Sequence, residues 1–244
     1  MTEAPQQTVL MIGATSSLAQ AMCHVLAAQG YGLILAGRDV TELEFLAADL
    51  DTRHHTPTAI LTIDFLARNF SPQRLLQQAE DFDHVIIATG DMGDNDADNL
   101  PNIAQNMTLN YTLPAQIATV CAEHLRTKKQ GSITFISSVA GDRGRQSNYI
   151  YGSAKAALNA FASGMRNRYC KQGVHVMTVK PGFIDTPMTW GMKSPLIASR
   201  EYVAQHIIAA MHKRKDVVYV PFFWKYIMLI IIHIPEKIFK RLSL

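Results

Sequence analysis

Tyr151 and Lys155 lie four residues apart in the stretch Tyr-Gly-Ser-Ala-Lys, within a segment that has helical spacing. Residues four apart share one face of a helix, so the phenol and the ammonium can lie close together. Tyrosine titrates near ~10 when unperturbed, and a neighbouring positive charge lowers that value. Ser138, at the end of a predicted strand, can supply a hydroxyl that binds a carbonyl oxygen. These three side chains predict acid/base chemistry at an oxygen atom whose carbon gains or loses hydride.

A turn of small residues follows the first predicted strand, Thr8–Ile12. It reads Gly13-Ala14-Thr15-Ser16-Ser17-Leu18 and leads into a helical segment. In dinucleotide-binding folds, the backbone amides of such a turn and the helix N-terminus hold a pyrophosphate. Gly13 is the only glycine of this turn, so ordinary strand-to-helix packing is the alternative interpretation.

The end of the second predicted strand bears on the choice of cofactor. An arginine there suits the 2′-phosphate of NADP(H), and the guanidinium of Arg38 offers a fork for a dianion. An acidic residue about 20 residues past the glycine turn would instead hold the ribose hydroxyl of NAD(H). Asp39 could play that role, or it could cap the next helix. We expect NADP(H) rather than NAD(H).

The elements that must position these residues alternate along the 244-residue chain. Apolar strands separated by amphipathic helices are typical of a parallel sheet covered on both faces. We expect an α/β fold over residues 1–221, a doubly wound parallel Rossmann sheet of about seven strands. The predicted strands are Thr8–Ile12, Gly32–Ala36, Thr58–Leu61, His84–Ala88, Ser132–Ile136, His175–Val179 and Val217–Val220. The most extended helical patterns cover Leu18–Ala28, Leu100–Arg126 and Tyr149–Lys171.

Composition narrows the class of protein. Hydrophobic residues make up 48% and charged residues 18%, which is ordinary for a folded domain with a core. Three cysteines, far apart and without a CxxC pair, favour reduced thiols in a cytoplasm-like compartment. The N-terminus shows no secretory signal pattern. We expect a cytoplasmic protein, no metal site and no nucleic-acid partner.

The segment after Pro221 has a different character from the rest of the chain. Residues 222–244 form an apolar and basic tail with about 13 apolar-core positions, too few for a bilayer-spanning helix, which needs ~20. Aromatic residues at one end and Lys237, Lys240 and Arg241 at the other fit a segment lying in a membrane interface. The alternative is a helix packed on its own domain or on a dimer partner. A peripheral position at the inner face of the membrane is the favoured prediction.

Taken together, the motifs resemble the short-chain dehydrogenase/reductase family over roughly residues 8–220. Ser138 in Phe-Ile-Ser-Ser-Val-Ala-Gly matches the family's active-site serine, and Tyr151 and Lys155 match its acid/base tyrosine and ribose-binding lysine. Asn110 matches the asparagine of a water-linked proton relay. The family's NNAG segment reads Ile-Ala-Thr-Gly here, ending at Gly90, which is a departure on the cofactor side.

The resemblance implies a cofactor site that extends beyond the glycine turn. Pro181, Gly182, Ile184 and Thr186 match the PGxxxT turn at the nicotinamide carboxamide, and Asp64 matches the residue at the adenine. The whole set expected at the cofactor is Gly13, Thr15, Ser16, Ser17, Leu18, Arg38, Asp64, Gly90, Tyr151, Lys155, Pro181, Gly182, Ile184 and Thr186.

The loop between Ser138 and Tyr151 should border the substrate. Arg143 and Arg145 in this loop suit a polar or anionic substrate, although pairing with Asp142 on the surface is the alternative. The substrate set is therefore Ser138, Arg143, Arg145 and Tyr151. The stretch also resembles, at the level of a subfamily, the reductase subunit of the decaprenylphosphoryl-ribose 2′-epimerase, which reduces a keto-pentose on a polyprenyl phosphate.

These expectations combine into one predicted activity. The protein would reduce a ketone, which the resemblance extends to a keto-sugar or a lipid-linked carbonyl, with NADP(H). The resemblance implies that Tyr151 donates the proton, Ser138 holds the substrate oxygen, Lys155 lowers the Tyr151 pKa, and Asn110 supports the relay. It would act as a homodimer or homotetramer. The rival hypothesis is a non-catalytic Rossmann protein that senses NADP(H) or docks at a membrane.

Overall fold

A computed structural model describes residues 7–79, 81–93 and 100–242. Seven parallel strands form one sheet in the order β3-β2-β1-β4-β5-β6-β7. The order reverses between β1 and β4, which is where open α/β sheets place their ligands. The strands are β1 (Thr8–Ile12), β2 (Gly32–Gly37), β3 (Thr58–Thr62), β4 (His84–Ile87), β5 (Ser132–Ile136), β6 (His175–Pro181) and β7 (Val217–Val220). The predicted α/β sheet is confirmed.

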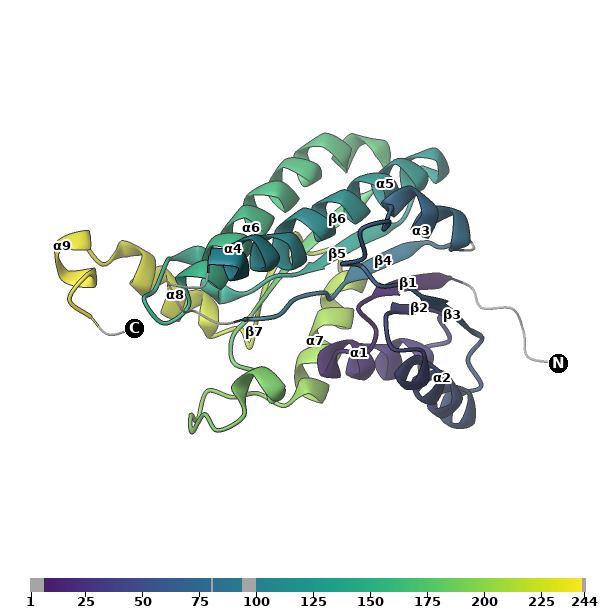
Figure 1. The fold of residues 1–244 in the computed structure, drawn as a ribbon, viewed down its shortest axis with the longest axis horizontal. Coiled ribbons are helices and arrows are strands. Elements are labelled where there is room, and N and C mark those ends of the chain that lie inside the picture. Colours follow the sequence, from purple (N-terminus) through teal and green to yellow (C-terminus); the bar gives the residue numbers. More distant parts are fainter. Residues whose placement is uncertain (1–6, 80, 94–99, 243–244) are drawn as a thin grey trace.

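Helices cover both faces of the sheet (Figure 1). One layer contains α1 (Ser17–Ala27), α2 (Val40–His54) and α7 (Arg200–His212). The other contains α3 (Pro72–Gln78), α4 (Leu100–Met107), α5 (Leu113–Lys128) and α6 (Tyr149–Tyr169). Side chains of a strand alternate between faces, so Val9 and Met11 enter the core under α1 while Leu10 and Ile12 enter the core under α5 and α6.

The single helix predicted over Leu100–Arg126 is interrupted. A π-helical turn, η1 (Thr108–Thr112), separates α4 from α5. Pro114 begins the regular part and has no backbone N–H, so the α-helical bond to the Asn110 carbonyl cannot form there. The extra residue in this turn places Asn110 inside the protein, where it is fully buried.

The tail forms two short helices, α8 (Trp224–His233) and α9 (Glu236–Phe239), which project at one end of the molecule in yellow (Figure 1). Trp224 and Met228 of α8 are buried in a small third core with Val139. Within the described ranges, no helix combines the length and the hydropathy that crossing a bilayer would require. The tail therefore packs partly on the domain.

Candidate active site

The four predicted catalytic residues meet at the carboxyl end of the sheet. Ser138 follows β5 and begins the short helix η2 (Val139–Asp142), where its Oγ accepts the Ala140 amide at 3.0 Å. Tyr151 and Lys155 lie on consecutive turns of α6, and the Ser138 hydroxyl is close enough to Tyr151 to act on the pKa of its phenol. The pair predicted from spacing alone is thus brought to the serine by the β5–α6 loop.

Lys155 is buried, with 2% of its surface exposed. Its Nζ donates to the Ile136 carbonyl at 3.1 Å and lies 5.5 Å from the Tyr151 ring centroid. Burial lowers the pKa of Lys155 from 10.5 to about 7, because the ammonium loses its hydration without gaining a carboxylate. The lysine is therefore poised to change its charge near neutral pH.

The expected lowering of the Tyr151 pKa is not found. Burial raises it to about 12, and the hydrogen bond to Ser138 opposes that rise only in part. The expectation failed because Lys155 is itself desolvated, so its positive charge is not the dominant influence on the phenol. In this state Tyr151 carries its proton at neutral pH and can donate it.

Asn110 is held by the residue one helical turn before it. Its Nδ2 donates to the Asp91 carbonyl at 2.8 Å, to the Asn106 carbonyl at 3.1 Å and to Asn106 Oδ1 at 3.0 Å. Its Oδ1 is buried and has no partner within the described part of the chain. Asn106 was missed in the sequence, although the Asn-x-x-x-Asn spacing is the signal that could have found it. The arrangement leaves one acceptor free for a water or a ligand hydroxyl.

Gly90 separates Asn110 from Lys155. A Cβ at this position would lie 2.8 Å from Asn110 Oδ1 and 3.1 Å from Lys155 Nζ. Only a glycine lets the chain after β4 pass this close to both polar groups. The segment Ile-Ala-Thr-Gly, which differs from the family's NNAG, therefore still ends in the glycine that the packing requires.

Backbone and hydroxyl groups at the carboxyl ends of β1 and β4 could hold the phosphates of a dinucleotide. Gly13 has φ +79°, and a Cβ there would lie 3.1 Å from the Thr89 amide nitrogen. Ser16 caps α1 by accepting the Ala19 amide at 3.3 Å, which leaves the first-turn amides of Ser17 and Leu18 without helical acceptors. Thr89, whose amide lies beside Gly13, has a buried Oγ1 that finds no partner among the described residues. Free donors, an orphaned hydroxyl and close backbone together form a cradle for phosphate groups.

Asp39 and Arg38 at the end of β2 have separate roles. The Asp39 carboxylate caps α2 by accepting the Glu42 amide at 3.1 Å, so the capping alternative is the one observed. Arg38 is exposed and, among the described residues, makes no hydrogen bond or ion pair. Asp64 lies beyond the neighbouring strand and accepts the Leu66 amide at 2.9 Å. The Asp39 carboxylate is thus partly engaged as a cap, whereas the Arg38 guanidinium is free of protein partners among the described residues.

The PGxxxT segment continues from the end of β6. The Gly182 amide donates to the Val220 carbonyl at 3.0 Å, and Ile184 forms an isolated parallel bridge with Ala198. Thr186 Oγ1 donates to the Ile184 carbonyl at 3.4 Å. A Cβ at Gly182 would overlap the indole of Trp224, so the tail packs directly on this segment.

The two predicted substrate arginines face different surroundings. Arg143 donates to carbonyls of α8, pairs with Glu236 and covers the Phe239 ring, so its guanidinium binds the tail. We therefore remove Arg143 from the substrate set. The alternative, an ion pair between these arginines and Asp142, is not observed, because Asp142 pairs with Lys180 at 2.6 Å. Arg145 is partly buried, with an unpartnered Nε.

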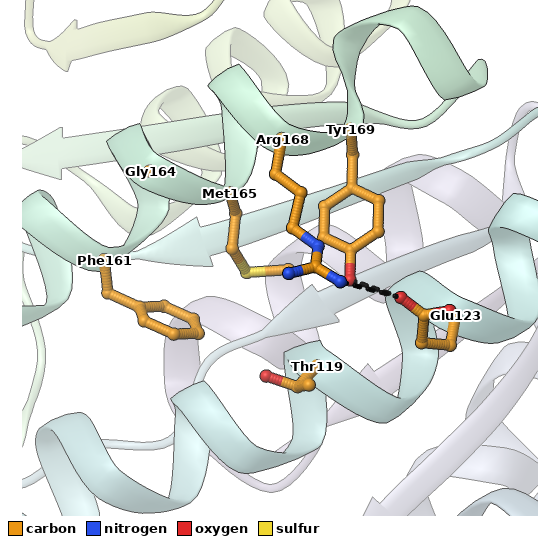
Figure 2. Close-up of a pocket in the computed structure, with 7 residues that line it drawn as sticks. All are labelled: Thr119, Glu123, Phe161, Gly164, Met165, Arg168 and Tyr169. Carbon is orange, nitrogen blue, oxygen red and sulfur yellow. Dashed lines mark hydrogen bonds and ion pairs between the residues drawn. The ribbon is translucent and has the colours of Figure 1, made fainter.

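A hollow of about 530 Å³ lies elsewhere, between α5 and α6 (Figure 2). Tyr169 donates to Glu123 at 2.7 Å on its wall. It is lined by Thr119, Glu123, Phe161, Gly164, Met165, Arg168 and Tyr169. None of the predicted site residues lines it, and Phe161 lies ten residues along α6 from Tyr151, about 15 Å by helical rise. It is separate from the catalytic residues.

Residues 7–196 match the family model described as short chain dehydrogenase. The chain belongs to this family. An uncharacterised oxidoreductase of Mycobacterium tuberculosis is 31% identical over 243 residues, covering 96% of each chain. This short-chain dehydrogenase is therefore an NAD(P)-dependent oxidoreductase.

Solved structures share its fold. A short chain dehydrogenase from Burkholderia cenocepacia in complex with NADP superposes with a TM-score of 0.83 at 20% identity, covering 98% of both chains. A bulky-bulky ketone specific alcohol dehydrogenase from Comamonas testosteroni gives a TM-score of 0.81 at 20% identity, covering 98% of this chain and 91% of the other.

Proposed function

We propose that this short-chain dehydrogenase reduces a ketone to a secondary alcohol with NADPH, using Tyr151 as the proton donor. The observation that carries the proposal is the grouping of Lys155 Nζ and Asn110 Oδ1 around Gly90, with Tyr151 one helical turn before Lys155 and its ring centroid 5.5 Å from Nζ. A hydride acceptor carbon needs its oxygen protonated, and a raised phenol pKa keeps that proton available.

Each side chain has a defined role in this mechanism. A bound nicotinamide cofactor supplies the hydride. Ser138 donates to the carbonyl oxygen and orients it, and Tyr151 transfers its proton to the same oxygen as negative charge develops there. Lys155 holds the ribose hydroxyls, and its ammonium stabilises the phenolate left behind. Asn110 Oδ1 accepts from a water that returns a proton through Lys155 to Tyr151.

Two observations favour NADP(H) over NAD(H). Arg38 is exposed and unpaired among the described residues, whereas Asp39 is occupied as a helix cap. The Burkholderia cenocepacia neighbour was solved with NADP. Replacing Arg38 with Ala should weaken NADPH binding about tenfold or more and leave NADH binding unchanged, since a charge-assisted hydrogen bond contributes about 1.5–3 kcal/mol. Equal weakening of both would refute the preference.

The substrate we propose is a ketone with a polar or anionic part, such as a keto-sugar or a lipid-linked keto-sugar. Arg145, with its unpartnered Nε, and Asn148, with a buried unpartnered Oδ1, support this class, as does the subfamily resemblance in their loop. NADPH oxidation should be screened over keto-sugars, lipid-linked keto-sugars, β-ketoacyl thioesters and bulky aromatic ketones. A preference for the uncharged aromatic ketones would contradict the assignment.

Tyr151→Phe tests the mechanism. It should lower turnover by about a hundredfold or more while NADPH affinity changes little, because general acid catalysis contributes about 10²–10⁴. Tyr149→Phe, two residues earlier and exposed, is the matched control. If the Tyr151 variant retains near-parental turnover, the mechanism is wrong. If the parent binds NADPH but none of the carbonyl compounds supports its oxidation, the hypothesis of a non-catalytic NADP(H) sensor explains the protein better.

We also propose that the enzyme is a cytoplasmic homo-oligomer, a dimer or tetramer, associated with a membrane through its tail. Free thiols at Cys23, Cys121 and Cys170 support a reducing compartment. Light scattering after gel filtration tests the oligomer, and a monomeric mass would refute it.

A further inference from the structure

The tail presents an apolar face away from the protein. Seven large hydrophobic side chains on or beside α8 and α9 are exposed, and Phe222 and Ile230 reach 70% and 68%. They are Phe222, Tyr226, Leu229, Ile230, Ile232, Ile238 and Leu242. We call this set the tail face. A patch of neighbouring apolar groups at one end of a protein marks a surface that something covers.

The tail face is held rigidly by contacts on its inner side. Trp224 and Met228, one turn apart on α8, are buried against Val139. Arg143 Nη1 donates to the carbonyls of Ile231, Ile232 and Ile234 at 3.2, 2.9 and 2.8 Å, which closes the C-terminal end of α8. The outward direction of the tail face is therefore fixed by the domain.

Arg143 also joins α9 to the same loop. Its Nη2 donates to Glu236 Oε2 at 2.8 Å, and its Cζ lies 3.9 Å from the centroid of the Phe239 ring. The loop that carries Arg143 begins at Ser138. Tail and active-site loop are thus one packed unit.

Exposed cations accompany the tail face, and by helical spacing Lys225 shares the side of α8 that carries Leu229 and Ile232. Lys225, Lys237, Lys240 and Arg241 are exposed, and none of them makes an ion pair among the described residues. Glu236, the one acid of the tail, is bound by Arg143. Exposed apolar groups together with unpaired cations match an anionic lipid surface, where hydrocarbon receives the apolar groups and headgroups receive the cations.

A second copy of the chain fits this surface less well. A two-fold interface brings the same patch together with itself, so the cations of the two tails would come close to each other. The length of α8, ten residues or about 15 Å, suits a helix lying in a membrane interface.

We propose that the tail face is a docking surface for an anionic lipid bilayer, and that Arg143 clamps it to the loop of Ser138. The docked enzyme then holds its catalytic serine beside the membrane. The docking of the tail face does not depend on which residue donates the proton in the reaction.

Sedimentation of the full chain with vesicles tests the docking. Phosphatidylcholine vesicles with and without phosphatidylglycerol are compared. Ile230→Glu should weaken binding about tenfold or more, since a buried isoleucine contributes at least that factor. Phe45→Glu is the matched control, because Phe45 is 71% exposed on α2, a helix that lies far from α8 and α9 in Figure 1. Lys240→Gln should cost about fivefold on anionic vesicles, with Lys171→Gln as its control.

Circular dichroism and NADPH oxidation with a water-soluble ketone, both unchanged in Ile230→Glu, separate loss of docking from loss of folding or of activity. Binding that needs phosphatidylglycerol and is lost in Ile230→Glu supports the proposal. Absence of binding to either vesicle overturns it, as does equal binding by Ile230→Glu. An oligomer that dissociates in Ile230→Glu without any vesicle binding assigns the tail face to a second copy and also overturns it.

Discussion

Replacing Lys155 with methionine should make the protein more stable while removing its activity. The ammonium of Lys155 is buried at 2% exposure, and its pKa falls from 10.5 to about 7. Each unit of pKa shift corresponds to 1.36 kcal/mol, so at pH 7 the fold gives up on the order of 4 kcal/mol to hold this group. Methionine has a similar length and requires no hydration.

Part of that gain is lost again. The Nζ donates to the Ile136 carbonyl at 3.1 Å, and leaving a buried acceptor unsatisfied costs about 1–3 kcal/mol. A net stabilisation of about 1–3 kcal/mol at pH 7 is therefore expected. The assay is urea unfolding of Lys155→Met and the parent, with Lys171→Met as an exposed control.

The dependence on pH gives the sharper test. Between pH 7 and 10.5 the unfolded parent binds a proton that the folded parent has released, so the parent's stability rises with pH across this window. The advantage of Lys155→Met should be largest at or below pH 7. Toward pH 10.5 it should reverse, because only the cost of about 1–3 kcal/mol for the unsatisfied Ile136 carbonyl remains in the variant. A variant that is less stable at pH 7, or a difference that does not change with pH, would refute the desolvation argument.

Three further changes test neighbouring parts of the site. Asn106→Ala removes the acceptor that orients the Asn110 amide at 3.0 Å, and should lower kcat about tenfold with KM unchanged, measured by NADPH oxidation. Gly182→Ala places a methyl group against the buried indole of the tail and should destabilise the fold by about 1–3 kcal/mol in urea. Arg143→Met should speed amide hydrogen exchange in α8 at least tenfold, since charged hydrogen bonds contribute about 1.5–3 kcal/mol, whereas Arg200→Met should not. Unchanged values would contradict each argument.

The sheet could be predicted because its information is local. Buried parallel strands are continuous apolar runs, and each of the seven was located to within two residues of its observed bounds. Tyr151, Lys155 and Ser138 were also accessible, since helical spacing and a strand end place them on one side of the fold. The π turn at Asn110 was not, because it depends on a missing donor at Pro114 within an otherwise regular helical pattern.

Long-range contacts and burial explain the remaining differences. Arg143 was predicted at the substrate, but its partners lie 88 to 93 residues later in the chain and could not be inferred from its neighbours. The direction of the Tyr151 pKa depends on how much water reaches the phenol, which spacing does not report. The position of Arg143 and the pKa of Tyr151 are both determined by packing between segments that lie far apart in the sequence.

Three buried polar groups that cost the fold stability lie near the carboxyl ends of β4 and β5. Their presence together is best explained by a function that requires them. Lys155 is desolvated, Asn110 Oδ1 is buried without a partner, and so is Thr89 Oγ1. Each costs stability that an apolar residue of similar size would not, since a buried unsatisfied group is penalised by about 1–3 kcal/mol. Buried polar groups normally have hydrogen-bond partners. Several such groups without partners near the reversal of strand order are expected where a bound ligand supplies the missing interactions. A cofactor bound there with hydroxyl and phosphate groups would satisfy all three, so its binding should raise the unfolding temperature of the parent more than that of Lys155→Met.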